Sequence, residues 1–123
     1  MTTTEPLWGP AALQAGLEAV GYAPHQRTGF IVFDYTVEVG PYAGQIVKIG
    51  LPTAADFPTT PPSGPHVSPR LGHPHGAVHP SGLGTEWEYW SRPAANWAAD
   101  RSVQGYLRHL RTLFAQLDER AAA

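Results

Sequence analysis

Apolar residues recur along this chain with two spacings, one typical of helices and one typical of strands. The helical spacing occurs first at Leu13, Leu17 and Val20, between Pro10 and Gly21. Proline suits the first turn of a helix, and glycine commonly follows the last turn. The pattern therefore predicts a short N-terminal helix.

The two-residue spacing of a strand is clearest between Phe30 and Val39, where a row of apolar residues alternates with a more polar row. The turn sequence of residues 40–44 follows, and residues 45–51 predict a second strand. Because the connection is short, the two strands are expected to form an antiparallel hairpin.

Periodicity disappears between Pro52 and Trp97, a segment rich in proline and glycine. It contains too many aromatic residues for a disordered linker, so an ordered, largely extended path is expected. Residues 66–68 are a candidate third strand.

A second amphipathic helix is predicted near the C-terminus. Asp100 is a candidate N-cap, and the apolar stripe that follows continues over four turns: Val103, Tyr106, Leu107, Leu110, Leu113, Phe114 and Leu117. Together these elements predict a single α+β domain over residues 1–123, with an N-terminal helix, a small antiparallel β-meander, an irregular Pro/Gly-rich segment and a long C-terminal helix.

Composition narrows the possible functions. A formal charge of −2 gives no basic field, so nucleic-acid binding is not expected. The chain has no cysteine, which excludes disulfides, thiolate metal sites and thiol nucleophiles. It lacks a secretory signal and an apolar run of roughly 18 residues that could span a membrane, so a cytoplasmic location is expected.

Several short motifs resemble those of the ubiquitin-conjugating (UBC-like) superfamily. Residues 40–49 resemble its "GPxxxPYxGGxF" turn and strand, and residues 57–62 are similar to its "YPxxPP" stretch. Either His73-Pro74 or His79-Pro80 resembles its "HPN" motif, and Trp97 matches the tryptophan before the last helix. The resemblance spans residues 10 to 118 and is greatest to short bacterial members.

The resemblance implies a UBC-like fold and a bacterial ubiquitin-like modification pathway. The implied partners are a ubiquitin-like protein, an adenylating protein or a JAB-type peptidase. In the family, the catalytic cysteine follows "HPN" and would fall between Leu83 and Trp90, where this chain has none. The "HPN" asparagine is replaced by His75 or Ser81. A non-catalytic binding or scaffolding role without a cofactor is therefore implied.

Aromatic and proline residues are the expected partner-binding surface, because the alternation in residues 87–90 leaves at least one aromatic side chain exposed. The residues concerned are Phe57, Pro61, Pro62, Trp87, Tyr89 and Trp90.

Two chemical alternatives remain open from the sequence. His73, His75 and His79 are spaced so that they could hold zinc in a small metal-dependent hydrolase. Ser81 or Ser91 could act as a nucleophile with His79 or His75 as its base. A structural or dimerising module without a ligand is a further alternative.

Overall fold

The computed structural model describes residues 7–74, 76–94 and 96–117. Along these residues the elements are α1 (Gly9–Ala19), β1 (His25–Arg27), β2 (Phe30–Thr36), β3 (Ile46–Pro52), β4 (His66–Ser68), β5 (Val78–Ser81), β6 (Gly84–Trp90), the 3₁₀ turn η1 (Trp97–Ala99) and α2 (Val103–Ala115). The predicted N-terminal helix, the antiparallel hairpin of β2 and β3, and the candidate strand at residues 66–68 are confirmed.

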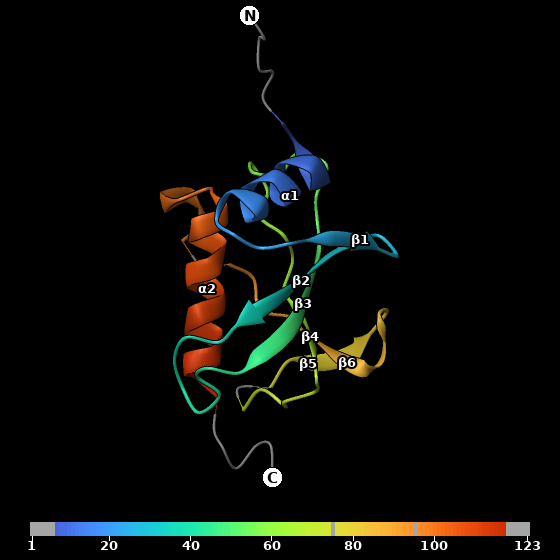
Figure 1. The fold of residues 1–123 in the computed structure, drawn as a ribbon, viewed down its shortest axis with the longest axis vertical. Coiled ribbons are helices and arrows are strands. Elements are labelled where there is room, and N and C mark those ends of the chain that lie inside the picture. The colour runs from blue at the N-terminus through green and yellow to red at the C-terminus, as the bar shows by residue number, and fades with distance from the viewer. Residues whose placement is uncertain (1–6, 75, 95, 118–123) are drawn as a thin grey trace, which may run out of the picture.

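The strands form one six-stranded antiparallel sheet in the order β1-β2-β3-β4-β6-β5 (Figure 1). The α+β class is confirmed, but the expected UBC-like fold with a small β-meander and a long C-terminal helix is wrong. The sheet is larger than predicted, and α2 has 13 residues, ending at Ala115.

The segment after Pro52 is also more regular than predicted, because it contains β4, β5 and β6. Its aromatic residues anchor it to the core, as expected. The Trp97 indole Nε1 donates to the Pro58 carbonyl at 2.8 Å, and the Trp97 ring lies 5.9 Å from that of Phe57.

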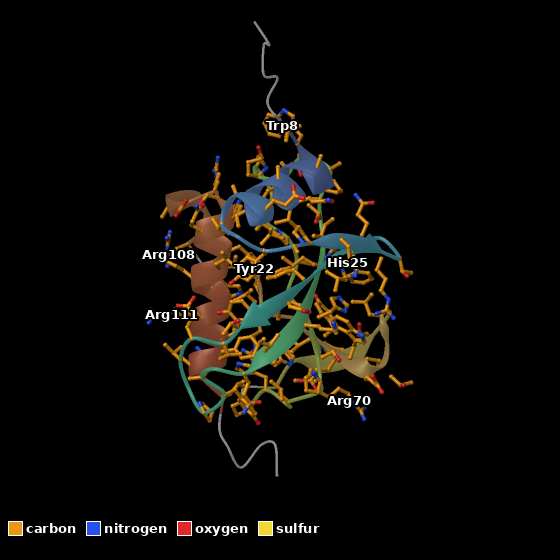
Figure 2. All side chains as sticks on the ribbon, in the orientation of Figure 1. Trp8, Tyr22, His25, Arg70, Arg108 and Arg111 are labelled. Carbon is orange, nitrogen blue, oxygen red and sulfur yellow. The ribbon has the colours of Figure 1, made fainter. Side chains whose placement is uncertain are left out.

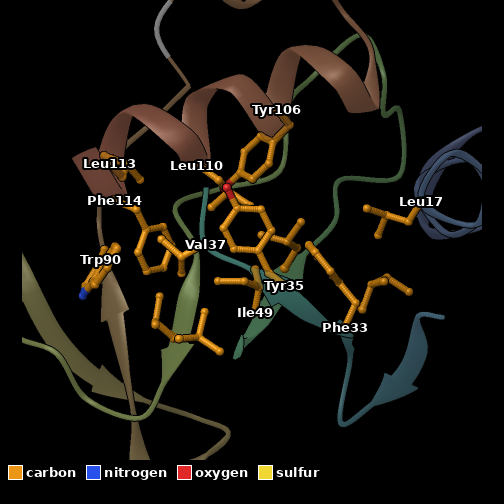
Figure 3. Close-up of a cluster of buried hydrophobic side chains, with 14 of the residues drawn as sticks. Leu17, Phe33, Tyr35, Val37, Ile49, Trp90, Tyr106, Leu110, Leu113 and Phe114 are labelled. Atoms are coloured by element: carbon orange, nitrogen blue, oxygen red, sulfur yellow. The ribbon is translucent and has the colours of Figure 1, made fainter. Parts of the chain in front are cut away.

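Alternate residues of the strands face the two helices and form the main core (Figure 3). Leu13 and Leu17 of α1 pack into it beside Tyr106, Leu110 and Phe114 of α2. The buried Trp90 ring lies 5.3 Å from that of Phe114, which ties β6 to α2. Both helices therefore cover the same face of the sheet, which we call the helix face.

The N-cap of α2 is Ser102 rather than the predicted Asp100. The Ser102 Oγ accepts a hydrogen bond from the Gly105 N–H at 3.1 Å, as an N-cap side chain does. The Asp100 carboxylate instead accepts from the Ser102 hydroxyl and pairs with Arg108, and these contacts lower the pKa of Asp100.

In the part of the chain that the structure describes, no helix is both long and apolar enough to cross a lipid bilayer.

Candidate functional site

The face of the sheet opposite the helices carries a row of polar and aromatic side chains. The strand registers align six residues across this outer face, one from each strand: His25, Val32, Gly50, His66, Tyr89 and His79. The His66 ring stacks on Tyr89 with centroids 4.6 Å apart and meets the edge of Phe30 at the same distance. The outer face therefore has an ordered aromatic surface of its own.

His66 lies at the centre of this row and is connected to the turn between β5 and β6. Its Nδ1 lies 2.6 Å from the Ser81 Oγ, which also accepts a hydrogen bond from the Leu83 N–H at 3.0 Å. Burial lowers the pKa of His66 from 6.5 to about 4, so its ring is neutral at pH 7. The Ser81 hydroxyl can then donate to His66 Nδ1 while its oxygen accepts from Leu83.

This His66–Ser81 pair was missed by the sequence reasoning, which assigned His79 or His75 as the base for Ser81. A serine nucleophile needs a base with a pKa near the working pH, and a histidine with a pKa of about 4 is a weak base. The structure does bring together Ser91 and His79, another predicted pair. The Ser91 Oγ lies 3.0 Å from the Nε2 of the exposed His79. The buried pair is better suited to holding the turn in place than to activating Ser81.

The turn between β5 and β6, which Ser81 links to His66, places Leu83 on the outer face of the sheet. The buried Leu83 forms a small cluster with Val32, Trp87 and the half-buried Phe30. Gly50 makes room for it, because a Cβ at that position would lie 2.5 Å from Leu83 Cδ1. Arg27 fixes the turn from β1, since its Nη2 donates to the Leu83 carbonyl at 3.2 Å and its guanidinium lies over the Trp87 ring.

A hollow of about 510 Å³ follows β5 and this turn, and we call it the β5–β6 groove. Its wall includes the exposed side chains of Arg70, His79 and Thr85, together with Val78, Pro80, Ser81, Gly82, Gly84, Trp87 and Glu88. Figure 2 shows Arg70 at the end of the molecule farthest from α1. A second hollow, of about 320 Å³, shares Gly84, Thr85 and Trp87 with the first. Hollows of this volume are large enough for a small ligand or a side chain of a partner.

The histidines predicted to bind zinc are separated by the sheet. His73 is buried on the helix face, where its ring meets Trp90 and its Nε2 lies 3.2 Å from the Leu113 carbonyl oxygen. His79 lies on the outer face against Tyr89. His75 lies outside the described residues, and among those described no group of three metal-ligating side chains occurs. The geometry therefore does not bring His73 and His79 together around one ion.

The predicted partner-binding residues are mostly buried. Phe57 and Trp90 belong to the main core, Trp87 lies beneath the β5–β6 turn, and Pro62 is also buried. Pro61 and Tyr89 keep partial exposure. Trp90 Nε1 donates to Glu88 Oε2, which also accepts from the Gly72 N–H at 2.8 Å, so Trp90 helps to satisfy a buried carboxylate.

An exposed tryptophan lies outside the residues predicted to bind a partner. Trp8, at the start of α1, is 54% exposed, and the neighbouring Leu7 is 53% exposed (Figure 2). Trp8 precedes the helical stripe and falls outside the aromatic cluster of residues 87–97, so no pattern in the sequence marked it as a surface residue.

No protein-family model matches the chain, and neither a curated protein nor a solved structure matches it.

Proposed function

We propose that this protein is a non-catalytic binding or scaffolding protein that holds a partner in the β5–β6 groove. The observation that carries the proposal is the groove itself, a hollow of about 510 Å³ with exposed Arg70 and His79 in its wall. Among the described residues Arg70 has no ion pair, so its charge is available to a partner.

The chemistry around the groove supports binding rather than catalysis. The chain has no thiol that could carry a thioester. The Ser81 hydroxyl is engaged by Leu83 and His66, and His66 is a weak base. The wall instead combines a cation, hydroxyl groups and apolar side chains, which is the mixture found at specific protein contacts.

The partner belongs to a ubiquitin-like modification pathway in this proposal. That part rests on the likeness of residues 40–49 and 57–62 to short motifs of ubiquitin-conjugating enzymes. The proposed partners are a ubiquitin-like protein or an adenylating protein, with a JAB-type peptidase as a further member of the same pathway. A cytoplasmic location is part of the same proposal.

A pull-down with purified ubiquitin-like and adenylating proteins of the same organism tests this function. Arg70→Glu reverses the charge in the groove wall, and Arg101→Glu reverses an exposed charge next to α2. We expect Arg70→Glu to lower recovery of the partner about tenfold, whereas Arg101→Glu retains it. Equal recovery with both variants, or no recovery with wild type, would count against the proposal.

A further inference from the structure

One half of β2 has a neighbouring strand on one side only. β1 pairs with Phe30, Ile31 and Val32, and no other residue of β2 has a partner in β1. Before His25 the chain passes through Pro24, whose ring nitrogen has no hydrogen to donate, and leads away to α1. From Phe33 to Thr36, β2 therefore pairs only with β3.

The hydrogen bonds at the end of β2 show which backbone groups face the open side. Val37 N–H donates to the Gln45 carbonyl at 2.9 Å, and the Val37 carbonyl accepts from Gly44 N–H at 2.8 Å. Successive residues of an antiparallel strand direct these groups to alternate sides, so Phe33 and Tyr35 face β3 as Val37 does. Asp34 and Thr36 then present their N–H and C=O groups to the open edge, where the described residues place no strand.

A groove already lies beside these groups. It has a volume of about 400 Å³ and is lined by Gly21, Tyr22, Ala23, His25, Phe33, Asp34, Thr36 and Lys48. The Tyr22 ring borders it on the helix face, 5.0 Å from the ring of Phe33. The exposed Asp34 and Lys48 pair borders it on the outer face, with 3.2 Å between Nζ and Oδ1. Figure 2 labels Tyr22 and His25, between which the chain passes from α1 to β1.

The opposite edge of the sheet differs from this one. β5 carries Pro80, which has no N–H, and a register shift between Pro80 and Ser81. Proline and bulges are common devices that prevent an edge strand from pairing further. The stretch from Phe33 to Thr36 contains no proline and keeps a regular register with β3. The sheet thus has one blunted edge and one edge that remains able to pair.

We propose that the open edge of β2, from Asp34 to Thr36, binds an extended segment of a partner protein as an added antiparallel strand in line with β1. An extended chain repeats its backbone groups every two residues, about 6.8 Å, which is the separation between Asp34 and Thr36. A residue opposite Tyr35 would direct its side chain toward Tyr22, which favours an apolar residue. A residue opposite Asp34 would lie on the outer face, which favours lysine or arginine.

This edge is separate from the β5–β6 groove, so either site can fail while the other remains. The test uses the full chain labelled with ¹⁵N and the probe peptide acetyl-Lys-Val-Lys-Val-Lys-amide. We expect the amide protons of Asp34 and Thr36 to exchange rapidly in the free protein and to become protected by the peptide. The peptide acetyl-Glu-Val-Glu-Val-Glu-amide, with the opposite charge, is expected to bind more weakly.

A matched pair of variants identifies the backbone group. Thr36→Pro removes the outward N–H of Thr36, while Thr36→Val keeps that N–H and alters only the side chain. We expect Thr36→Pro to weaken peptide binding about tenfold, corresponding to the loss of one hydrogen bond, and Thr36→Val to leave it within about twofold. A far-ultraviolet circular dichroism spectrum of each variant checks the fold.

Three results would overturn the proposal. The first is protection of the Asp34 and Thr36 amides in the free protein at every concentration, and the second is peptide binding that leaves these amides unaffected. The third is protection that grows with protein concentration without peptide, which would assign the edge to a second copy of this chain. The wild-type exchange measurement decides the matter even if Thr36→Pro fails to fold.

Discussion

Each face of the sheet buries a cluster of apolar side chains, but the two clusters differ in size and are covered in different ways. The helix face packs against α1 and α2 and buries a continuous core. The outer face is covered over part of its area by a single turn, which places Leu83 over Gly50 and Val32. Strand β6 contributes side chains to both faces. Trp90 and Glu88 lie on the helix face, and Trp87 and Tyr89 lie on the outer face.

Because of this difference, the two faces contribute differently to the stability of the fold and to the surface available to a partner. A face packed by two helices gains most of the free energy of burial and leaves little surface for a partner. A face covered by a turn keeps hollows beside the turn, and here two of them flank Trp87. We therefore propose that a partner binds beside this turn, in the β5–β6 groove, whose wall includes Trp87 of the outer face and Glu88 of the helix face.

The largest expected effect is the loss of the core tryptophan. Trp90→Ala removes a fully buried ring and one of the two donors that the described residues supply to the buried Glu88 carboxylate, so we expect the free energy of unfolding to fall by about 3–5 kcal/mol. Trp87→Ala acts on the smaller outer cluster and should cost about 2 kcal/mol. Urea denaturation of both variants checks the difference, and equal losses would contradict the contrast between the two faces.

The second prediction concerns the loss of folding stability at acidic pH. The pKa of His66 is lowered by burial from 6.5 to about 4, so the folded state favours the neutral ring. The unfolded state therefore binds the proton more readily, and stability is complete above pH 6.5 and falls as the pH decreases toward 4. Over this window we expect His66 to contribute a loss on the order of 2–3 kcal/mol.

Urea denaturation at pH 7 and at pH 4.5 measures this loss. His66→Gln should reduce the dependence on pH, whereas His25→Gln, at an exposed position in the same row, should leave it as in wild type. An unchanged pH dependence in His66→Gln would show that other groups are responsible.

The third prediction tests the contact between Gly50 and the turn that covers the outer face. In Gly50→Ala, the added methyl group would lie 2.5 Å from Leu83 Cδ1 and must displace the side chain on the turn, so we expect a loss of about 1–2 kcal/mol. Gly82→Ala is the matched control, because its nearest neighbour outside the adjoining residues is the Phe30 ring at 4.0 Å. Thermal melting of both variants distinguishes a specific contact with Leu83 from a general effect of the substitution.

The smallest effect is expected at Tyr35 in the core. Its hydroxyl is buried and has no hydrogen-bond partner among the described residues, and burial raises its pKa to about 12. Removing an unsatisfied buried hydroxyl relieves a desolvation cost, so Tyr35→Phe should be neutral or stabilise the protein by up to about 1 kcal/mol. A destabilised Tyr35→Phe protein in urea would indicate that the hydroxyl has a partner.

The sequence predicted the elements whose two faces differ in polarity. α1, β2, β3 and α2 each place an apolar row against the helix-face core, so their spacing was informative. Asp100 and Ser102 are both suitable N-cap residues, and the choice between them depended on backbone geometry that the sequence does not show.

The remaining strands lacked such a contrast. β1 consists of three exposed residues, and its only signal was the Thr28-Gly29 turn, in which both residues have positive φ. β6 buries residues on both faces, including Glu88, so polar and apolar positions do not alternate along it. β5 is short and interrupted by Pro80.

The candidate site was harder to predict than the fold. The residues that meet on the outer face come from six strands and one turn, and the register that aligns His66 with Tyr89 and His79 depends on tertiary pairing. The tryptophans of β6 were predicted to contact a partner, but both are buried, and their burial depends on α2 and on the turn that holds Leu83. The resemblance to short motifs of ubiquitin-conjugating enzymes gave no information about the packing of α2 or of this turn against the tryptophans.

Chemical-shift mapping of the partner contact tests the proposed binding in the β5–β6 groove most directly. The ¹⁵N-labelled protein would be titrated with the ubiquitin-like or adenylating protein recovered in the pull-down. We expect the largest shifts at Arg70, His79, Gly84 and Thr85, which surround the β5–β6 groove. Shifts confined to the exposed side of α2, with those four amides unchanged, would contradict it.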